Sequence, residues 1–257
     1  MNRNKIDAVE LAEQTIWEGF RIYAEAPGTS IIEDDFVSAV CTGVPYEGFN
    51  GAIGRGSIRS GQIDDIMDLF RAANVRMLWH VWPADRGIES ALLERGLVFY
   101  EEEPAMVADL AVETSDSSPI DVHIRTTRDL EDLYVWVRIL SGSSNETFIR
   151  RVAELRGAAD SRTGARFEHL LGLVDGDLVA TAGVFHGTRA AEVQHIATER
   201  SHRRRGIGTA MTVAALEVVR RQGGRYAVLT ASPDGFGIYE RLGFETVATV
   251  RRFLGRP

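Results

Sequence analysis

The sequence predicts an α/β fold with a mixed sheet, built from two related halves. The first observation is a strand, a glycine-containing turn and a helix that follow one another over residues 193–219. The second is a pair of apolar runs on either side of Asp175-Gly176-Asp177, which is typical of a β-hairpin. The third is a strand–proline–helix–strand pattern that occurs at Pro83 and again at Pro233. Hairpins combined with strand–helix–strand units give both antiparallel and parallel strands in one sheet.

The first half of the chain contains the less complete copy of this pattern. Its elements around Pro83 have the order of the elements around Pro233, 150 positions later. A glycine-rich stretch, residues 51–56, lacks the strand, arginine cluster and immediate helix of residues 193–219, so we expect a degenerate ligand site here. The predicted elements are strands over residues 76–83, 98–100 and 106–110 and a helix over residues 87–95.

Residues 111–121 are small, polar and acidic and include one proline, which is typical of a linker. We therefore predict an N-terminal domain of residues 1–112 and a C-terminal domain of residues 121–257. Thr126 or Thr127 is the expected cap of the first helix of the second domain. The predicted strands of this domain are residues 122–125, 169–174, 178–186, 190–198, 226–230 and 245–250. The predicted helices are residues 127–140 and 146–157, a long helix after Gly208 whose apolar face includes residues 211–219, and a short helix that ends in residues 239–244.

The composition is that of an ordinary globular protein, with 257 residues of which 44% are hydrophobic and 26% charged. No apolar run approaches the roughly 20 residues that span a bilayer, so we expect no membrane association. The start of the chain lacks an apolar signal segment, and Cys41 is the only cysteine, so we expect a cytoplasmic protein. The net charge of −8 argues against a nucleic-acid partner, and we expect a monomer or a homodimer.

The segment from residue 193 to residue 219 predicts an anion site. Gly206 and Gly208 precede a helix, and at a helix N-terminus unpaired N–H groups and the helix dipole both favour a phosphate. The arginines of residues 203–205 add positive charge, although such a run can also be a solvated surface. No Gly-Lys-Ser/Thr follows, which excludes a P-loop, and Met211 replaces the third glycine of a dinucleotide fingerprint.

Three motifs in this half resemble the GNAT superfamily of acetyl-CoA-dependent N-acetyltransferases. Residues 203–208, Arg-Arg-Arg-Gly-Ile-Gly, are similar to that family's Arg/Gln-x-x-Gly-x-Gly/Ala motif. Ile196-Ala197-Thr198 resembles the strand before it, and residues 239–244 resemble its Tyr-x-x-x-Gly-Phe signature. The resemblance covers residues 121–254 and implies a GNAT-like fold, with a degenerate GNAT-like copy in the first half.

The resemblance implies that acetyl-CoA is the co-substrate and that no metal is needed. Backbone N–H groups of residues 204–209 would hold the pyrophosphate, and the strand backbone of residues 196–198 would hold the pantetheine arm and the thioester carbonyl. Ser232 stands where many members contact the CoA arm. The expected cofactor-binding residues are Ile196, Ala197, Thr198, Arg203, Arg204, Arg205, Gly206, Ile207, Gly208, Thr209 and Ser232.

Two side chains are candidates for proton transfer. Glu192 lies on the central strand at the spacing of a general base in some family members; the alternatives are a solvated residue or a salt bridge to the substrate. Tyr239 matches the general-acid position, and its alternative is a tyrosine packed on the sheet. His195 competes with Glu192 as the base, but strand alternation predicts that it faces away from Glu192, Gln194 and Ile196.

The resemblance implies transfer of acetyl from acetyl-CoA to a primary amine of a small molecule or peptide, by direct attack in a ternary complex. The alternatives are a non-catalytic acyl-CoA sensor and a scaffold domain with incidental arginines. Residues 1–120 contain 9 Lys and Arg against 21 Asp and Glu, whereas residues 121–257 contain 20 against 16. If the acidic half lines the cleft, a cationic acceptor is expected; otherwise the charge serves solubility.

Overall fold

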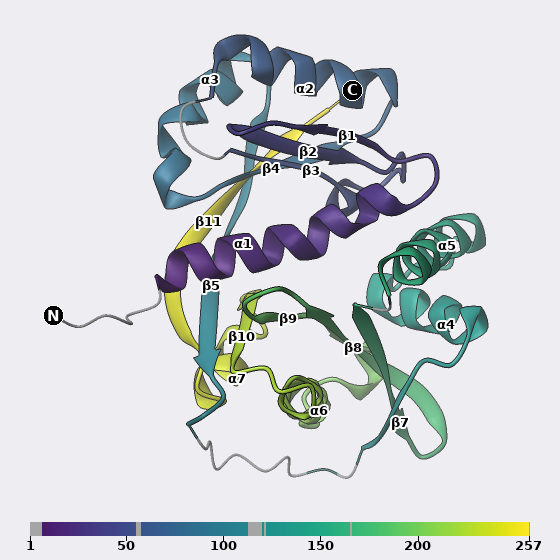
Figure 1. Cartoon of the computed structure of the whole chain (residues 1–257). Coiled ribbons are helices and arrows are strands. Elements are labelled where there is room, and N and C mark those ends of the chain that lie inside the picture. The colour runs from purple at the N-terminus through teal and green to yellow at the C-terminus, as the bar shows by residue number, and fades with distance from the viewer. Residues whose placement is uncertain (1–6, 55–57, 113–119, 121, 165, 257) are drawn as a thin grey trace, which may run out of the picture. The chain divides into compact units, whose positions relative to one another are not determined.

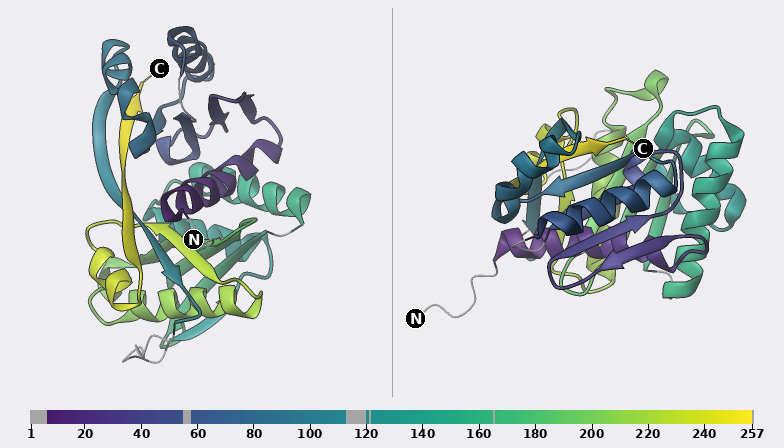
Figure 2. Two further views of the ribbon diagram at one scale, coloured as in Figure 1. Left: turned by 60° about the vertical axis from the view of Figure 1, so that its left-hand side comes forward. Right: turned by 90° about the horizontal axis from the view of Figure 1, so that it is seen from above.

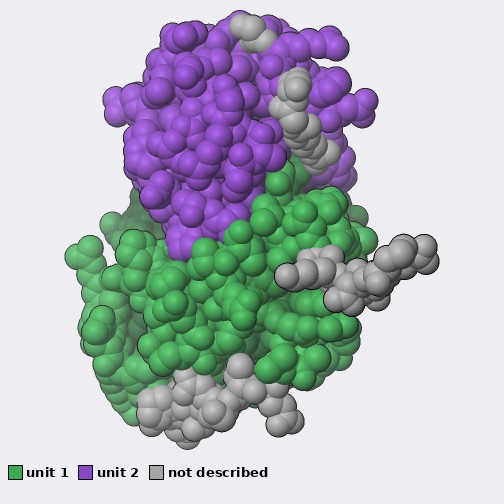
Figure 3. All heavy atoms as spheres, turned by 90° about the vertical axis from the view of Figure 1, so that its left-hand side faces the viewer, with its two compact units in different colours: residues 1–19, 105–247 green, residues 20–104, 248–257 purple. Residues whose placement is uncertain are grey.

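The computed structural model describes residues 7–54, 58–112, 120, 122–164 and 166–256. The chain forms two compact units, coloured separately in Figure 3. Unit 1 contains Met1–Gly19 and Ala105–Val247, and unit 2 contains Phe20–Pro104 and Ala248–Pro257. Most of the predicted linker, residues 113–119 and 121, lies outside the described residues.

Unit 1 contains five helices and a mixed sheet among its described residues (Figure 1). The strands follow the order β5-β10-β9-β8-β7-β6 across this sheet. Strand β10 is parallel to β9 and antiparallel to β5, and the other neighbouring pairs are antiparallel. The elements are α1 (Ala8–Arg21), β5 (Val98–Asp109), β6 (His123–Thr126), α4 (Leu130–Ser141), α5 (Glu146–Thr163), β7 (Phe167–Val174), β8 (Asp177–His186), β9 (Ala191–Thr198), the 3-10 turn η4 (Arg200–His202), α6 (Ile207–Arg221), β10 (Tyr226–Thr230), α7 (Phe236–Arg241) and β11 (Glu245–Gly255).

The predicted hairpin joins β7 to β8. Asp175 and Gly176 have φ values of 53° and 92°, which is the left-handed backbone of a type I′ turn. Glycine adopts this conformation without strain and aspartate tolerates it, so the two-residue loop keeps the twist of the flanking strands.

Helices cover both faces of the unit 1 sheet. The predicted apolar stripe of α6 is buried on one face, where Met211, Ala215 and Val219 join a core with Val184 and Val193. Trp136 of α4 lies on the other face, and its indole N–H donates to the carbonyl of Ala182 at 3.0 Å. Figures 1 and 2 show α6 and α1 on opposite sides of β8 and β9.

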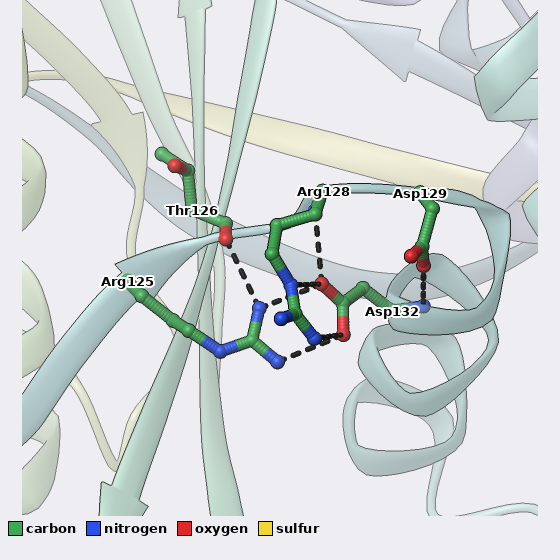
Figure 4. Close-up of polar contacts among 5 residues, drawn as sticks. All are labelled: Arg125, Thr126, Arg128, Asp129 and Asp132. Carbon is green, nitrogen blue, oxygen red and sulfur yellow. Dashed lines mark hydrogen bonds and ion pairs between the residues drawn. The ribbon is translucent and has the colours of Figure 1, made fainter.

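The first helix of the second domain begins later than predicted. Its cap is Asp129, whose carboxylate accepts from the backbone N–H of Asp132, and not Thr126 or Thr127. Figure 4 shows the reason: Asp132 is buried and accepts hydrogen bonds from the guanidinium groups of Arg125 and Arg128. These ion pairs join the end of β6 to the first turn of α4 and determine where the helix starts.

Unit 2 repeats the arrangement on a smaller scale, with strand order β1-β2-β3-β4-β11. Its core contains Phe70, Trp79 and Phe253, all nearly inaccessible. Strand β3 is parallel to β4, as β9 is to β10. Its elements are the 3-10 turn η1 (Ile22–Glu25), β1 (Ser30–Glu33), β2 (Val37–Cys41), η2 (Glu47–Phe49), β3 (Asn50–Gly54), α2 (Ser60–Ala72), β4 (Met77–Val81), η3 (Pro83–Ile88) and α3 (Glu89–Glu94), followed by parts of β5 and β11.

The glycine-rich stretch of the first half was wrongly expected to lack a strand, because Asn50–Gly54 forms β3. Small residues fit this position because the ring of Phe20 would lie 3.1 Å from a Cβ at Gly51. Residues 55–57 of this stretch lie outside the described residues.

Strand β5 is one strand of 12 residues, although two separate strands were predicted around Glu101-Glu102-Glu103-Pro104. Arg252 of β11 explains the continuity, because its Nη1 lies 2.9 Å from carboxylates of both Glu101 and Glu103. Arg251 lies 3.8 Å from Glu102. The opposite charges allow an acidic run to remain in a strand.

The sequence repeat corresponds to two strand–helix–strand segments, β4–α3–β5 and β10–α7–β11. The last strand of each segment contributes to both units: residues 105–109 of β5 pair with β10, and residues 251–255 of β11 pair with β4. The predicted mixed α/β fold class is confirmed. No helix in the described ranges has the length and apolarity to cross a membrane.

Candidate functional site

The candidate site lies where β9 and β10 stop pairing. Their parallel register consists of Ala191 with Ala227 and Glu192 with Val228, yet β9 continues to Thr198 and β10 to Thr230. Beyond Glu192, the backbone N–H and C=O groups on the edge of β9 that faces β10 are therefore not paired with β10. A ligand with amide groups can pair with such an edge, and ligands bind at the carboxyl ends of parallel strands. Ile196, Ala197 and Thr198 occupy this edge.

A β-bulge interrupts the β8–β9 ladder directly before these residues. The register shifts between Thr181 and Gly183, and His195 has a φ of 57°. The ring of His195 contacts Trp136 at 5.5 Å between centroids, whereas Ile196 packs against the α6 core. His195 therefore lies on the Trp136 face together with Glu192 and away from Ile196. The predicted orientation was correct relative to Ile196 and wrong relative to Glu192, because the bulge breaks strand alternation.

The turn after β9 leads directly into the N-terminus of α6. Arg204 and Gly206 have φ values of 63° and 86°, which bend the chain into the helix. The first helical hydrogen bond runs from Ala210 N–H to the carbonyl of Gly206, so the preceding N–H groups of residues 207–209 have no helical acceptor. Aligned N–H groups and the helix dipole favour an anion here.

The three arginines of this turn are exposed. Arg203 donates from Nε to the carbonyl of Thr198 at 3.0 Å, which holds the turn against the end of β9. Arg204 and Arg205 extend the positive charge beside the helix N-terminus. Gly208 follows in the first helical turn, where an added Cβ would lie 3.5 Å from Ile238, an ordinary contact.

Glu192 is buried, with 9% of its surface exposed, and lies beneath helix α1. A Cβ at Gly19 of α1 would overlap its Oε2, so the bare backbone of Gly19 makes room for the carboxylate. Glu18 attaches α1 here, accepting from the N–H of Thr188 at 2.8 Å and from Arg166 at 3.3 Å. Helix α1 was not predicted, although Asp7 accepts from the N–H groups of Val9 and Glu10 and buried residues follow at helical spacing.

Tyr239 lies in α7 and is 9% exposed. Its ring packs over Gly235, where a Cβ would lie 3.0 Å from the phenol oxygen, and contacts Phe244 at 5.9 Å. Ser232, which follows β10, is exposed, and its Oγ accepts from the N–H of Gly235 at 3.3 Å. All of the predicted site residues lie in unit 1, on β9, on the turn into α6, or after β10.

The corresponding position in unit 2 contains a buried acidic side chain. A Cβ at Gly54, the end of β3, would lie 3.2 Å from the carboxyl carbon of Asp85, which is buried. At the start of α2 the Gln62 side chain accepts from Arg59 N–H and donates to Asp34. A carboxylate beside the strand end repels an anion, which supports the expectation of a degenerate site.

Comparisons with known proteins agree with this geometry. Residues 133–244 match the Acetyltransferase (GNAT) family. Comparison with curated protein sequences gives no match. Among solved structures, the chain resembles a GCN5-related N-acetyltransferase from Kribbella flavida, with a TM-score of 0.71 and 21% identity over 97% of this chain and 95% of that chain. It also resembles a tandem GNAT protein from the clavulanic acid biosynthesis pathway, with a TM-score of 0.62 and 15% identity over 100% and 97% of the two chains.

A GCN5-related N-acetyltransferase from Sphaerobacter thermophilus is similar over 97% of this chain and 92% of that chain, with a TM-score of 0.61 and 14% identity. The fold is therefore that of a tandem GNAT protein. Residues 133–244 match the model of the acetyltransferase (GNAT) family, so the predicted resemblance of the second half to this family is confirmed.

Proposed function

We propose that this protein transfers an acetyl group from acetyl-CoA to a primary amine of a small molecule or peptide, by direct attack in a ternary complex. The observation that carries the proposal is the separation of β9 from β10 immediately beside the helix N-terminus at Gly206. One ligand with both an amide-containing arm and a pyrophosphate matches this combination.

The described residues fit acetyl-CoA. The N–H groups at the start of α6 and the charge of residues 203–205 suit the pyrophosphate. The backbone of residues 196–198 suits the pantetheine amides and the thioester oxygen. Ser232 stands at the end of β10 and can contact the same arm. Thr209 lies in the first turn of α6, within the same anion site.

The proposed chemistry uses Glu192 and Tyr239. An amine must lose a proton before or during attack, and Glu192 is assigned as the general base that takes it. The amine nitrogen then forms a bond to the thioester carbonyl carbon, and the carbon–sulfur bond breaks. The departing thiolate takes a proton from the hydroxyl of Tyr239. No residue of the chain needs to form a covalent intermediate, and the proposal needs no metal.

Calorimetry with CoA tests the binding half of the proposal. Gly206→Glu places a side chain and a negative charge at the helix N-terminus, so it should abolish CoA binding. Because Gly206 has a φ of 86°, the new side chain also strains the backbone, and the thermal unfolding midpoint should fall modestly while the protein stays folded. CoA at 100 times its dissociation constant should stabilise the wild type by about 2.7 kcal/mol. Gly223→Glu is a matched control, because Gly223 also has a positive φ, 76°, and nothing lies within 4 Å of a Cβ there. Unchanged affinity in Gly206→Glu would contradict the assignment.

A non-catalytic acyl-CoA sensor is the second candidate, and the burial of Glu192 beneath α1 favours it. An assay of free CoA release with a panel of amines separates the two functions. An enzyme releases CoA only when an accepted amine is present, whereas a sensor binds acetyl-CoA without amine-dependent release.

The acceptor is proposed to be cationic, because the first 120 residues are strongly acidic. Steering by this charge would raise kcat/KM for cationic amines, and salt would reduce the advantage over neutral amines. A preference for anionic acceptors would overturn this part of the proposal.

A further inference from the structure

Arg156 of α5 is completely buried, although it carries a charge. Its guanidinium carbon lies 4.6 Å from the ring centre of Trp136 and 5.6 Å from that of Phe167. A buried cation is expensive unless its donors have partners, so its retention requires specific contacts. Aromatic faces supply part of the compensation.

Two histidines supply polar contacts. Nη1 of Arg156 lies 2.9 Å from Nε2 of His169, and Nη2 lies 3.2 Å and 3.1 Å from the two ring nitrogens of His195. An arginine only donates hydrogen bonds, so Nε2 of His169 accepts from Nη1. A neutral imidazole has a single acceptor nitrogen, so one of the two His195 ring nitrogens accepts from Nη2. Burial, followed by the charge of Arg156, holds the pKa of both histidines well below the ordinary value, which keeps the rings neutral.

His195 is also the residue at which β9 departs from regular geometry. Its φ of 57° is uncommon for a residue with a side chain and persists only where the surroundings hold it. Its carbonyl accepts from the hydroxyl of Thr181 at 2.9 Å, which fixes the backbone on one side of the bulge. Arg156 holds the ring on the other side. The residues that follow, 196–198, are those assigned to the thioester.

We propose that Arg156 is a positioning residue: by holding the ring of His195, it fixes the β9 bulge and thereby directs the backbone of residues 196–198 toward the thioester carbonyl. The inference rests on the proposed acetyl transfer and adds a residue from a helix that has no part in the sequence motifs. The buried guanidinium orients the backbone that stabilises the developing oxyanion. It therefore affects the chemical step more than it affects affinity for CoA, because the pyrophosphate keeps its site at the α6 N-terminus.

A double-mutant cycle on the full chain tests this inference. The variants are Arg156→Met, His195→Gly and their combination; glycine keeps the positive φ and removes only the ring. Each single variant should lower kcat at least tenfold and leave the calorimetric Kd for CoA within about threefold of the wild-type value. The double variant should have a kcat no lower than that of the single variants, because both substitutions remove the same interaction. Arg150→Met is the matched control: Arg150 is exposed on the same helix and stacks on Tyr134 at 5.5 Å. It should retain wild-type kcat.

A conservative variant separates positioning from general stabilisation. His195→Asn tolerates the left-handed backbone and offers an accepting oxygen, so it should recover most of the kcat lost in His195→Gly. If Arg156→Met does not fold, the comparison of His195→Gly with His195→Asn decides. A wild-type kcat in His195→Gly would overturn the inference. So would equal decreases of kcat in His195→Gly and His195→Asn, or a double variant whose kcat decrease is the product of the two single decreases.

Hydrogen exchange of residues 193–198 gives a readout that does not depend on activity. Arg156→Met should accelerate exchange there, and Arg150→Met should not. If the wild-type protein neither binds CoA nor transfers acetyl, the proposed function fails, and the exchange result still shows whether Arg156 holds the bulge. Unchanged exchange in a folded Arg156→Met variant would overturn the structural part of the inference.

Discussion

The hydroxyl of Tyr239 is the group for which removal of a single atom is most informative. Tyr239→Phe keeps the ring that packs over Gly235 and against Phe244, so the fold should survive. If the phenol protonates the leaving thiolate, kcat should fall at least tenfold, about 1.4 kcal/mol of barrier, with little change in KM for acetyl-CoA. Steady-state kinetics at saturating substrate measure this. Wild-type turnover would mean that water protonates the thiolate and that Tyr239 only packs.

Gly19 offers an independent test of Glu192. A methyl group at residue 19 would overlap the Glu192 carboxylate, so Gly19→Ala must displace it. We expect Gly19→Ala to reduce kcat in the same direction as Glu192→Gln, while CoA affinity stays unchanged because the anion site lies at the other end of β9. The reduction should be greatest at low pH for Glu192→Gln, where deprotonating the amine is hardest.

Gly61→Ala is the control for this substitution, because it adds a methyl to a helix where nothing lies within 4 Å. It should change neither kcat nor CoA affinity and should stabilise the fold by up to about 1 kcal/mol. If Gly19→Ala has the same kcat as Gly61→Ala, displacing the Glu192 carboxylate does not affect catalysis, and the assignment of Glu192 as the general base fails.

The junction between β6 and α4 depends on charge. Hydrogen bonds from Arg125, and then from Arg128, hold the pKa of the Asp132 carboxyl well below its ordinary value despite burial. Its pKa is depressed in the folded state, so its contribution to stability is present above pH ~4 and is lost as pH falls further. Asp132→Asn should lower the free energy of unfolding by about 2 kcal/mol at neutral pH, because it removes charged hydrogen bonds and leaves the partly buried Arg125 without its carboxylate partner.

Chemical denaturation between pH 7 and pH 3 measures this prediction. The difference between wild type and Asp132→Asn should shrink below pH ~4, where the wild-type carboxyl begins to be protonated. Asp68→Asn is the control, since Asp68 pairs with Arg71 on an exposed helix surface, and its loss should be at most about 0.5 kcal/mol. A pH-independent difference would show that the ion pairs do not stabilise this junction.

At the scale of the whole molecule, the two units differ in the charge at the end of their parallel strand pairs. Unit 1 presents arginines and helix N–H groups, whereas unit 2 places the Asp85 carboxyl beside Gly54. We therefore expect one CoA per chain by calorimetry. Asp85→Ala should leave that stoichiometry at one, and Gly206→Glu should reduce it to zero. Two equivalent sites in the wild type would contradict the assignment of a degenerate unit 2.

Much of the second half was predictable because its signals are local. The 175–176 turn, the buried stripe of α6 and the glycines before it depend on residues within a few positions of one another, and the structure shows each of them. The bounds of the first helix were less predictable, because its start at the Asp129 cap is accompanied by the ion pair between Asp132 and Arg125 of β6. The continuity of β5 was missed because Arg252, far along the chain, neutralises its acidic run.

The sequence by itself determined the mixed α/β fold, the repeated strand–helix–strand segments and the motif positions, because periodicity, turn chemistry and motif spacing are local properties of a chain. Only the tertiary structure decided that His195 shares a face with Glu192, that Gly19 lies over that carboxylate, and that Arg156 contacts His195. These relations join residues up to 173 positions apart, and a single bulge reverses the alternation on which a local argument depends.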